Sequence, residues 1–254
     1  MSGWHIRMRR LFAVDGRAVI VALDHGQHKG NLPGLSPFRE TIRQVVEAGA
    51  DGLILNPGAM RMGVEVCDRN VSLILRVTGA STDRDPCFDY HRLILPVEDA
   101  VAAGADAVIA MAFVGGKGEA PSLAQLARVA SACRRWGMPL IAEMLMSVPE
   151  RFHDLEWIEP ATRVAYELGA DVVKVYGASE EGFDKLVREC PVPVLAAGGP
   201  GGDDPIALAR KVIASGAAGV AFGRSVFGAH DPGTVVRRLV EVVHGVKGGA
   251  HVDR

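Results

Sequence analysis

The chain has 254 residues, of which 48% are hydrophobic and 23% charged, and its formal net charge is −2. These values are typical of a soluble globular enzyme, and without a Lys/Arg block they exclude nucleic acid as an expected partner. No apolar stretch reaches membrane-spanning length, and no signal-peptide core follows the basic N-terminal segment. The four cysteines form neither a CxxC pair nor a metal spacing. We therefore expect a cytoplasmic protein with reduced thiols, no metal and no membrane partner.

Apolar runs and helical patterns alternate along the chain. Four apolar runs lie at 19–23, 73–77, 140–142 and 192–196. Four more form the ends of a repeated pattern, in which a helical stretch stops at a glycine and a short turn leads into the strand; the repeats are 47–55, 102–110, 167–175 and 214–222. Glycine suits the left-handed position after a helix because it has no Cβ to clash. Strands that are apolar throughout are typical of a parallel sheet covered by helices.

The predicted helices fill the intervals between these strands. The clearest are 37–48, 122–136, 160–168 and 205–215. Eight strand–helix units in a chain of this length predict an α/β fold, a single (β/α)8 barrel. The chain 1–254 is then one domain, with short flexible segments at 1–10 and 245–254. The alternative is a doubly wound open sheet, which usually has a glycine-rich dinucleotide turn after its first strand; 24–30 is not such a turn.

Lys174 is the most informative residue of the chain. It lies within the apolar run 170–176, so its side chain either reaches water or enters a partly desolvated site. Desolvation disfavours an ammonium group and lowers a lysine's pKa, which produces a neutral amine able to attack a carbonyl. The alternative is a surface lysine on an edge strand. Active sites of (β/α)8 barrels lie at the C-terminal strand ends, where Asp24 and Glu143 are also predicted.

Two glycine-rich turns follow the last two predicted strands. The first contains Gly198 and Gly199, and the second contains Gly223 and Arg224. In this fold the loops after strands 7 and 8 commonly bind phosphate, through backbone N–H groups and, here, a guanidinium. We therefore expect a phosphorylated substrate. The alternative is that the glycines only make tight turns and that Arg224 forms a surface ion pair.

Four motifs, at 22–26, 173–176, 190–200 and 219–227, carry a resemblance to a known family. The chain resembles the class I aldolases of the archaeal fructose-bisphosphate aldolase type. That group includes 2-amino-3,7-dideoxy-D-threo-hept-6-ulosonate synthase and a thiolase that acts on phosphorylated autoinducer-2. The resemblance implies that Lys174 forms a Schiff base, that Asp24 is an acid/base, and that the glycines and Arg224 hold phosphate. It also implies a homo-oligomer, often a ring-shaped decamer.

One position departs from this family. Its aldolases carry a proton-donating tyrosine at the end of strand 5, where this chain has Leu145. Glu143 lies two residues earlier and hence on the same strand face, so it is a candidate for the acid/base role. The alternative for Glu143 is a structural pairing with Lys174 or Arg76. Tyr176 shares the face of Lys174 and is a weaker candidate for the donor.

Two further residues of the first strand end are candidate substrate contacts. His25 and Gly26 follow Asp24 directly. Strand alternation turns His25 away from the face of Asp24 unless the turn has already begun. His25 and His28 are three residues apart, but no further ligand cluster supports a metal site.

The expected function is reversible aldol cleavage or condensation of a phosphorylated ketose through a Schiff base on Lys174, without a cofactor. The fructose-bisphosphate aldolase reaction is the leading case. A transaldol reaction like that of the heptulosonate synthase and a coenzyme A-dependent thiolase reaction are the enzymatic alternatives. A sugar-phosphate-binding protein that has lost turnover is the non-enzymatic one.

Overall fold

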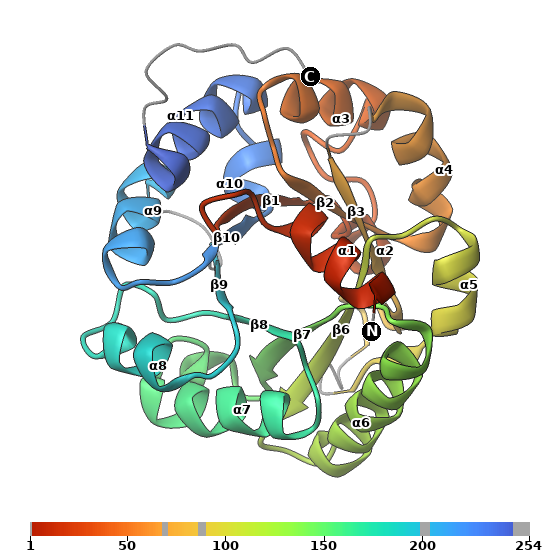
Figure 1. Cartoon of the computed structure of the whole chain (residues 1–254), viewed down its shortest axis with the longest axis vertical. Helices are drawn as coiled ribbons and strands as arrows, with labels where there is room; N and C mark the ends of the chain where they lie inside the picture. The colour runs from red at the N-terminus through yellow and green to blue at the C-terminus, as the bar shows by residue number, and fades with distance from the viewer. Residues whose placement is uncertain (1, 68–70, 86–89, 199–203, 246–254) are drawn as a thin grey trace.

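A closed barrel of eight parallel strands, surrounded by helices, forms the protein (Figure 1). The computed structural model describes residues 2–67, 71–85, 90–198 and 204–245. The barrel strands are β1 (Ala18–Ala22), β2 (Gly52–Leu55), β3 (Ser72–Arg76), β6 (Ala107–Val114), β7 (Leu140–Met146), β8 (Val172–Val175), β9 (Val194–Ala197) and β10 (Gly219–Phe222). Their order around the barrel is β1-β10-β9-β8-β7-β6-β3-β2. The predicted (β/α)8 fold is confirmed, and the open-sheet alternative is wrong.

The longer helices form the outer layer of the barrel (Figure 1). They are α3 (Phe38–Glu47), α4 (Pro57–Val66), α5 (Val97–Ala102), α6 (Glu119–Trp136), α7 (Leu155–Glu167), α8 (Phe183–Glu189), α9 (Pro205–Ala214) and α11 (Pro232–His244). The short helices α2 (Gly26–Lys29) and α10 (Arg224–Phe227) and the 3₁₀ turn η1 (Pro149–Arg151) follow the C-terminal ends of β1, β10 and β7. None of the helices within these described ranges is long and apolar enough to cross a bilayer.

Apolar side chains fill both faces of the barrel wall. On β1, Val19 and Val21 pack outward against the helices, whereas Ala18 and Ile20 pack inside the barrel. Because successive strand residues point to opposite faces, burial on both faces explains why the strands read as continuous apolar runs. The pattern locates each strand but does not tell which residues point inward.

The glycines of the four repeats have the backbone conformation that the sequence predicted. Gly49, Gly104, Gly169 and Gly216 have φ between +83° and +103°. An L side chain is strained in this left-handed region, so glycine lets each helix end and the chain turn back into the barrel.

The N-terminal segment 1–10 was expected to be flexible, and this expectation is wrong for its described residues. Helix α1 (Ser2–Leu11) lies across the N-terminal end of the barrel (Figure 1). Trp4 Nε1 donates a hydrogen bond to Asp171 at 2.8 Å, and Arg10 pairs with Asp106 at 2.9 Å. Leu11, fully buried, joins the apolar side chains inside the barrel. The apolar face of α1 thus closes this end of the barrel. The basic residues of the segment made it look like an exposed, flexible tail in the sequence. Residues 246–254 of the predicted C-terminal tail lie outside the described residues.

Two local elements differ from the sequence-based expectation. Helix α7 begins at Leu155 rather than at Pro160, since the side chain of Asp154 accepts a hydrogen bond from Glu156 N and caps the helix five residues earlier. A short antiparallel pair, β4 (Thr78–Gly79) and β5 (Arg92–Leu93), lies beyond the end of β3. Each of its strands is two residues long, too short to produce a readable alternation.

Candidate active site

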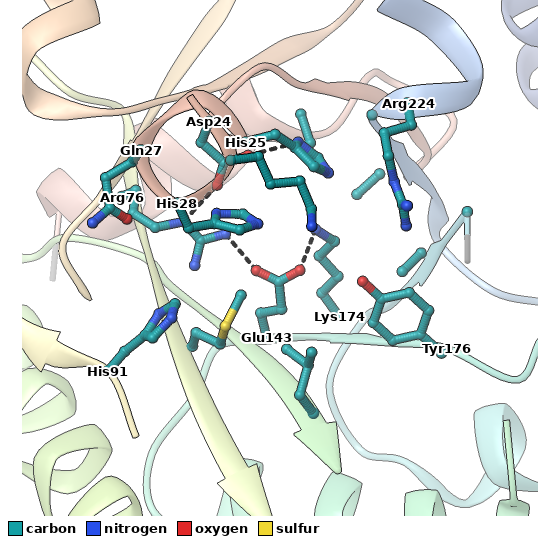
Figure 2. Close-up of a pocket in the computed structure, with 18 of the residues that line it drawn as sticks. Asp24, His25, Gln27, His28, Arg76, His91, Glu143, Lys174, Tyr176 and Arg224 are labelled. Atoms are coloured by element: carbon teal, nitrogen blue, oxygen red, sulfur yellow. Dashed lines mark hydrogen bonds and ion pairs between the residues drawn. The ribbon is translucent and has the colours of Figure 1, made fainter. Parts of the chain in front are cut away.

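A cavity of about 320 Å³ opens at the C-terminal ends of the strands. Charged side chains from four different strand ends line it: Asp24 after β1, Arg76 on β3, Glu143 on β7 and Lys174 on β8 (Figure 2). All four are buried, with exposed fractions between 3% and 6%. The surface-lysine alternative for Lys174 is therefore wrong, because the residue lies within the barrel wall and faces this cavity.

The four charged groups form one chain of ion pairs. Lys174 Nζ donates to Glu143 Oε1 at 2.5 Å. Arg76 donates to the other oxygen of Glu143 through Nη2 and to Asp24 Oδ2 through Nε, the latter at 2.5 Å. The order of charge along this chain is plus, minus, plus, minus. Buried charges persist only when they are paired and hydrogen-bonded, and this arrangement satisfies that requirement.

Strand register explains why Glu143 and Lys174 meet. They are direct partners in the parallel ladder between β7 and β8, and both point into the barrel at the same level. Leu145, two residues after Glu143, also lines the cavity. The predicted shared face of Glu143 and Leu145 is thus present. The predicted structural pairing of Glu143 with Lys174 or Arg76 is present too, with both residues at once.

Cations keep the two buried carboxylates ionised. Burial by itself raises the pKa of Glu143, but the charges of Lys174 and Arg76 outweigh it and hold the pKa well below its usual range. The same balance, burial against mainly Arg76, lowers the pKa of Asp24. Burial disfavours the charged form of Arg76 as well, yet Asp24 and Glu143 raise its pKa above the ordinary value. Both carboxylates are therefore ionised at neutral pH.

Histidines line the side of the cavity near Asp24. His25 Nδ1 lies 3.6 Å from Asp24 Oδ1, and burial lowers the pKa of His25 to about 4 despite that carboxylate. Burial likewise lowers the pKa of His91 to about 4. His28 also faces the cavity, with a pKa that burial lowers. His25 and His91 are therefore neutral at pH 7 and can act as hydrogen-bond partners but not as fixed cations.

The turn has already begun at His25. This residue precedes α2 with helical backbone angles, and for that reason its ring lines the cavity together with Asp24. Gly26 is the first residue of α2 and does not line the cavity. Of the two predicted contacts at this strand end, the structure brings only His25 to the site.

The predicted phosphate residues follow β9 and β10, and Gly223 lies next to His25. Gly198, Gly223 and Arg224 all line it, whereas Gly199 lies outside the described residues. A Cβ at Gly223 would lie 2.4 Å from His25 Cε1 and 3.0 Å from the carbonyl oxygen of Ala22. Only glycine lets the chain pass so close to His25. The guanidinium of Arg224 points into the cavity (Figure 2).

Leu145 and Tyr176 differ in what they offer the cavity. Leu145 packs with Met111 and Phe113 and supplies only apolar surface. Tyr176 stacks on Phe152 with ring centroids 5.9 Å apart, and its hydroxyl points into the cavity (Figure 2). Burial, with Glu143 as a further cause, raises the pKa of Tyr176 above its usual value. A phenol with a raised pKa is a poorer proton donor.

Several lining residues were not assigned to the site from the sequence. Arg76 was named only as a possible structural partner of Glu143, although a charge within a strand that is otherwise apolar was the available signal. His91, Lys29 and Asp83 lie outside the barrel strands and have no periodicity to reveal them. Lys29 and Asp83 form an ion pair of 2.6 Å at the mouth of the cavity.

Comparisons with known proteins find relatives along nearly the whole chain. The chain is 34% identical over 249 residues to 2-amino-3,7-dideoxy-D-threo-hept-6-ulosonate synthase 1 of Archaeoglobus fulgidus, covering 96% of this chain and 92% of that protein. It is 35% identical over 254 residues to 2-amino-4,5-dihydroxy-6-oxo-7-(phosphonooxy)heptanoate synthase of Streptomyces griseus, with the same coverage.

A solved structure of an aldolase has the same fold as this chain. It is an archaeal fructose-1,6-bisphosphate aldolase whose catalytic lysine is covalently bound to the carbinolamine intermediate of its substrate. It superimposes with a TM-score of 0.81 at 28% identity, covering 95% of this chain and all of the other. Residues 18–229 match the family described as DeoC/LacD family aldolase. The chain therefore belongs to the DeoC/LacD family of aldolases.

Proposed function

We propose that this aldolase reversibly cleaves or forms the carbon–carbon bond beside the ketone of a phosphorylated ketose, through a Schiff base on Lys174. The observation that carries the proposal is the 2.5 Å contact between Lys174 Nζ and Glu143 Oε1 in a buried cavity. A lysine must lose a proton before it attacks a carbonyl, and an ionised carboxylate at this distance is placed to accept that proton.

Glu143 has a second task in this mechanism. After the amine of Lys174 has added to the ketone, the resulting carbinolamine must lose its hydroxyl group as water. The proton that Glu143 took from Lys174 is the one it returns to that hydroxyl, and an iminium ion remains. The iminium then accepts the electron pair of the bond that breaks. Arg76 holds Glu143 by its other oxygen, so the carboxylate keeps its orientation while the proton moves.

Asp24 is the proposed base for the hydroxyl group on the far side of the breaking bond. Its lowered pKa keeps it ionised, and Arg76 fixes Oδ2, so that Oδ1 faces the cavity side where His25 lies. In the direction of bond formation, Asp24 returns this proton to the new hydroxyl.

The phosphate of the substrate is proposed to bind near Gly198, Gly223 and Arg224. A guanidinium forms strong charge-assisted hydrogen bonds to phosphate oxygens, and glycines allow close approach of the backbone N–H groups. Arg224 and Lys174 lie at neighbouring positions in the cavity (Figure 2). A phosphate held there fixes the carbonyl over the amine, which replaces a diffusive encounter by an oriented one.

The names of the relatives narrow the substrate. The heptanoate of the Streptomyces griseus enzyme has its phosphate on the carbon next to a ketone, and fructose 1,6-bisphosphate has the same arrangement. Aldol cleavage of either compound releases dihydroxyacetone phosphate, with an amino-acid aldehyde from the first and glyceraldehyde 3-phosphate from the second. We therefore propose dihydroxyacetone phosphate as the ketone half, with fructose 1,6-bisphosphate and the aminoheptanoate phosphate as the two compounds to assay.

Borohydride trapping tests the Schiff base. Incubation with dihydroxyacetone phosphate and borohydride, followed by peptide mass analysis, is expected to add the reduced ketone phosphate to Lys174. Lys29 is the matched control, because it lines the same cavity but pairs with Asp83 rather than with Glu143. Adduct on Lys29 alone, or no adduct in a preparation that turns over its substrate, would refute the proposal.

Other expectations stay predictions. A strict need for coenzyme A would favour the thiolase reaction over the aldolase reaction. The homo-oligomer and the cytoplasmic location expected from the sequence are open to measurement of the native mass and of cell fractions.

A further inference from the structure

Arg76 has one buried nitrogen that the charge network does not use. Nε binds Asp24 and Nη2 binds Glu143, but Nη1 has no hydrogen-bond partner among the described residues. The side chain is only 5% exposed, and Arg76 lines the cavity. A buried donor without a partner costs free energy, and in a native structure such a group calls for an explanation.

The position of Arg76 relative to Lys174 indicates what its unused nitrogen meets. The amine and the guanidinium bind opposite oxygens of one carboxylate, that of Glu143. Arg224, Lys174, Glu143 and Arg76 follow one another across the cavity, and His91 lies beyond Arg76 (Figure 2). A substrate with its phosphate at Arg224 and its carbonyl carbon at Lys174 extends toward Arg76 with the carbons that follow the carbonyl.

We propose that Arg76 is a catalytic residue whose Nη1 binds the oxygen on the aldehyde-forming carbon and stabilises the negative charge that develops there. This inference rests on the proposed aldol function and assigns the role that the family's missing tyrosine leaves open. Leu145, at that tyrosine's position, has no proton to give and lies in an apolar cluster. Tyr176 packs against the same apolar cluster, but its hydroxyl lies on the side of the cavity that holds Arg224 (Figure 2).

The step balances without any additional reactant. In cleavage, the hydroxyl proton moves to Asp24 and the carbon–carbon bond breaks. The electron pair of that bond passes to the iminium on Lys174 and gives an enamine. The oxygen that lost its proton becomes the aldehyde carbonyl. In condensation, the enamine carbon attacks the aldehyde, and the electron pair of the carbonyl moves onto its oxygen. Arg76 binds that oxyanion until Asp24 returns the proton. A tyrosine would supply the proton itself, whereas a guanidinium keeps its own and acts through its charge.

The variant Arg76→Lys distinguishes stabilisation of the oxyanion by Arg76 from a purely structural role of this residue. Lysine keeps the positive charge between Asp24 and Glu143 but has no third branch. Three steps are measured: borohydride trapping of dihydroxyacetone phosphate on Lys174, exchange of that ketone's C3 proton with deuterated water, and carbon–carbon cleavage. Trapping and exchange need no oxyanion site and are expected to stay within several-fold of the unmodified enzyme. Cleavage is expected to fall by about 10²- to 10³-fold, the usual effect of removing one oxyanion donor.

Two further variants make the result decisive. Arg61→Lys changes an exposed arginine of α4 in the same way and is expected to leave all three steps unchanged. Tyr176→Phe removes the competing donor without uncovering a charge, and it is expected to retain cleavage. Loss of cleavage in Tyr176→Phe, with exchange intact, would assign the role to the tyrosine and overturn the proposal, even if Arg76→Lys does not fold.

An equal loss of trapping, exchange and cleavage in a folded Arg76→Lys protein would also overturn it. That outcome would make Arg76 a positioning residue that acts only through Asp24 and Glu143. Failure of the unmodified enzyme to trap dihydroxyacetone phosphate on Lys174 is a different result, because it would refute the proposed aldol function itself.

Discussion

Both ends of this barrel carry carboxylates that are at least partly buried, but the two sets have different main partners. At the N-terminal end, Asp51, Asp106 and Asp171 come from three of the four repeats and accept hydrogen bonds from backbone N–H groups of the neighbouring strands, those of Val19, Leu73 and Leu140. At the C-terminal end, Asp24 and Glu143 bind the side-chain cations of Arg76 and Lys174.

The two sets differ in electrostatics as well. At the N-terminal end, burial raises the pKa of Asp171, whereas at the C-terminal end cations overcome burial and lower the pKa of Asp24 and Glu143. A carboxylate on a backbone N–H fixes one strand to the next, and these three also hold Trp4, Arg10 and His244 in place. A carboxylate on a lysine can take its proton. The aspartates of the repeats therefore connect strands at one end. Lys174, at a position that is apolar in the other repeats, and Glu143 form the proposed catalytic pair at the other end.

Replacing Lys174 by Met gives the largest expected effect. The variant removes the nucleophile, so kcat is expected to fall by roughly four orders of magnitude or more. Glu143 keeps its partner Arg76, so the barrel is expected to fold. Steady-state kinetics and thermal unfolding measure the two properties separately. A residual activity above one per cent would show that the amine is not essential.

Glu143→Gln is expected to lower kcat by about 10²- to 10³-fold, because the amide cannot accept the proton of Lys174. The measurement is the rate of Schiff-base trapping against time, which this variant should slow. Asp106→Asn is the matched control from the N-terminal end, with an expected loss of stability but not of activity per folded molecule. Full turnover in Glu143→Gln would show that the carboxylate has only a structural role.

Asp171→Ala tests the other end of the comparison. It leaves the Leu140 N–H and the Trp4 indole without their acceptor. The free energy of unfolding is expected to fall by about 2–3 kcal/mol, while kcat of the folded enzyme stays unchanged. Denaturant unfolding gives the first value and kinetics the second. Asp99→Ala, at an exposed position on α5, is the control. A large loss of kcat in Asp171→Ala would show that the two ends are coupled.

His244 gives the smallest expected effect, and it depends on pH. Its ring contacts Asp51 at 2.9 Å and Asp15 at 2.7 Å, and these contacts, chiefly that with Asp51, raise its pKa. A raised pKa stabilises the fold below the unfolded-state value near 6.5, and this stabilisation disappears as the pH rises through the folded-state value. His244→Ala is therefore expected to cost about 1 kcal/mol near pH 6 and less at pH 9. An equal cost at both pH values would contradict the charged pairing.

Particular residues show what the sequence could and could not predict. The glycine after each repeat helix and the apolar runs were sufficient to predict eight strands and a barrel, because both signals are local in the sequence. Lys174 and Glu143 could be placed on strands, but their ladder pairing depends on the closed barrel. The role of Arg76 depends on three other strand ends at once. Helix α1 was missed because its partners, Asp106 and Asp171, are far away in the chain.

Helix α1 also has a consequence for the order of events during synthesis. Trp4 and its acceptor Asp171 are 167 residues apart. At the usual translation rates, roughly 10 to 30 seconds pass between the emergence of the helix and that of its partner. During that interval the apolar residues that later close the barrel, Leu11 among them, have no barrel to enter. Helix α1, which leaves the ribosome before the barrel strands, is thus among the last segments that can reach their final place. For that time a nascent chain of this aldolase presents an uncovered apolar face to the cell.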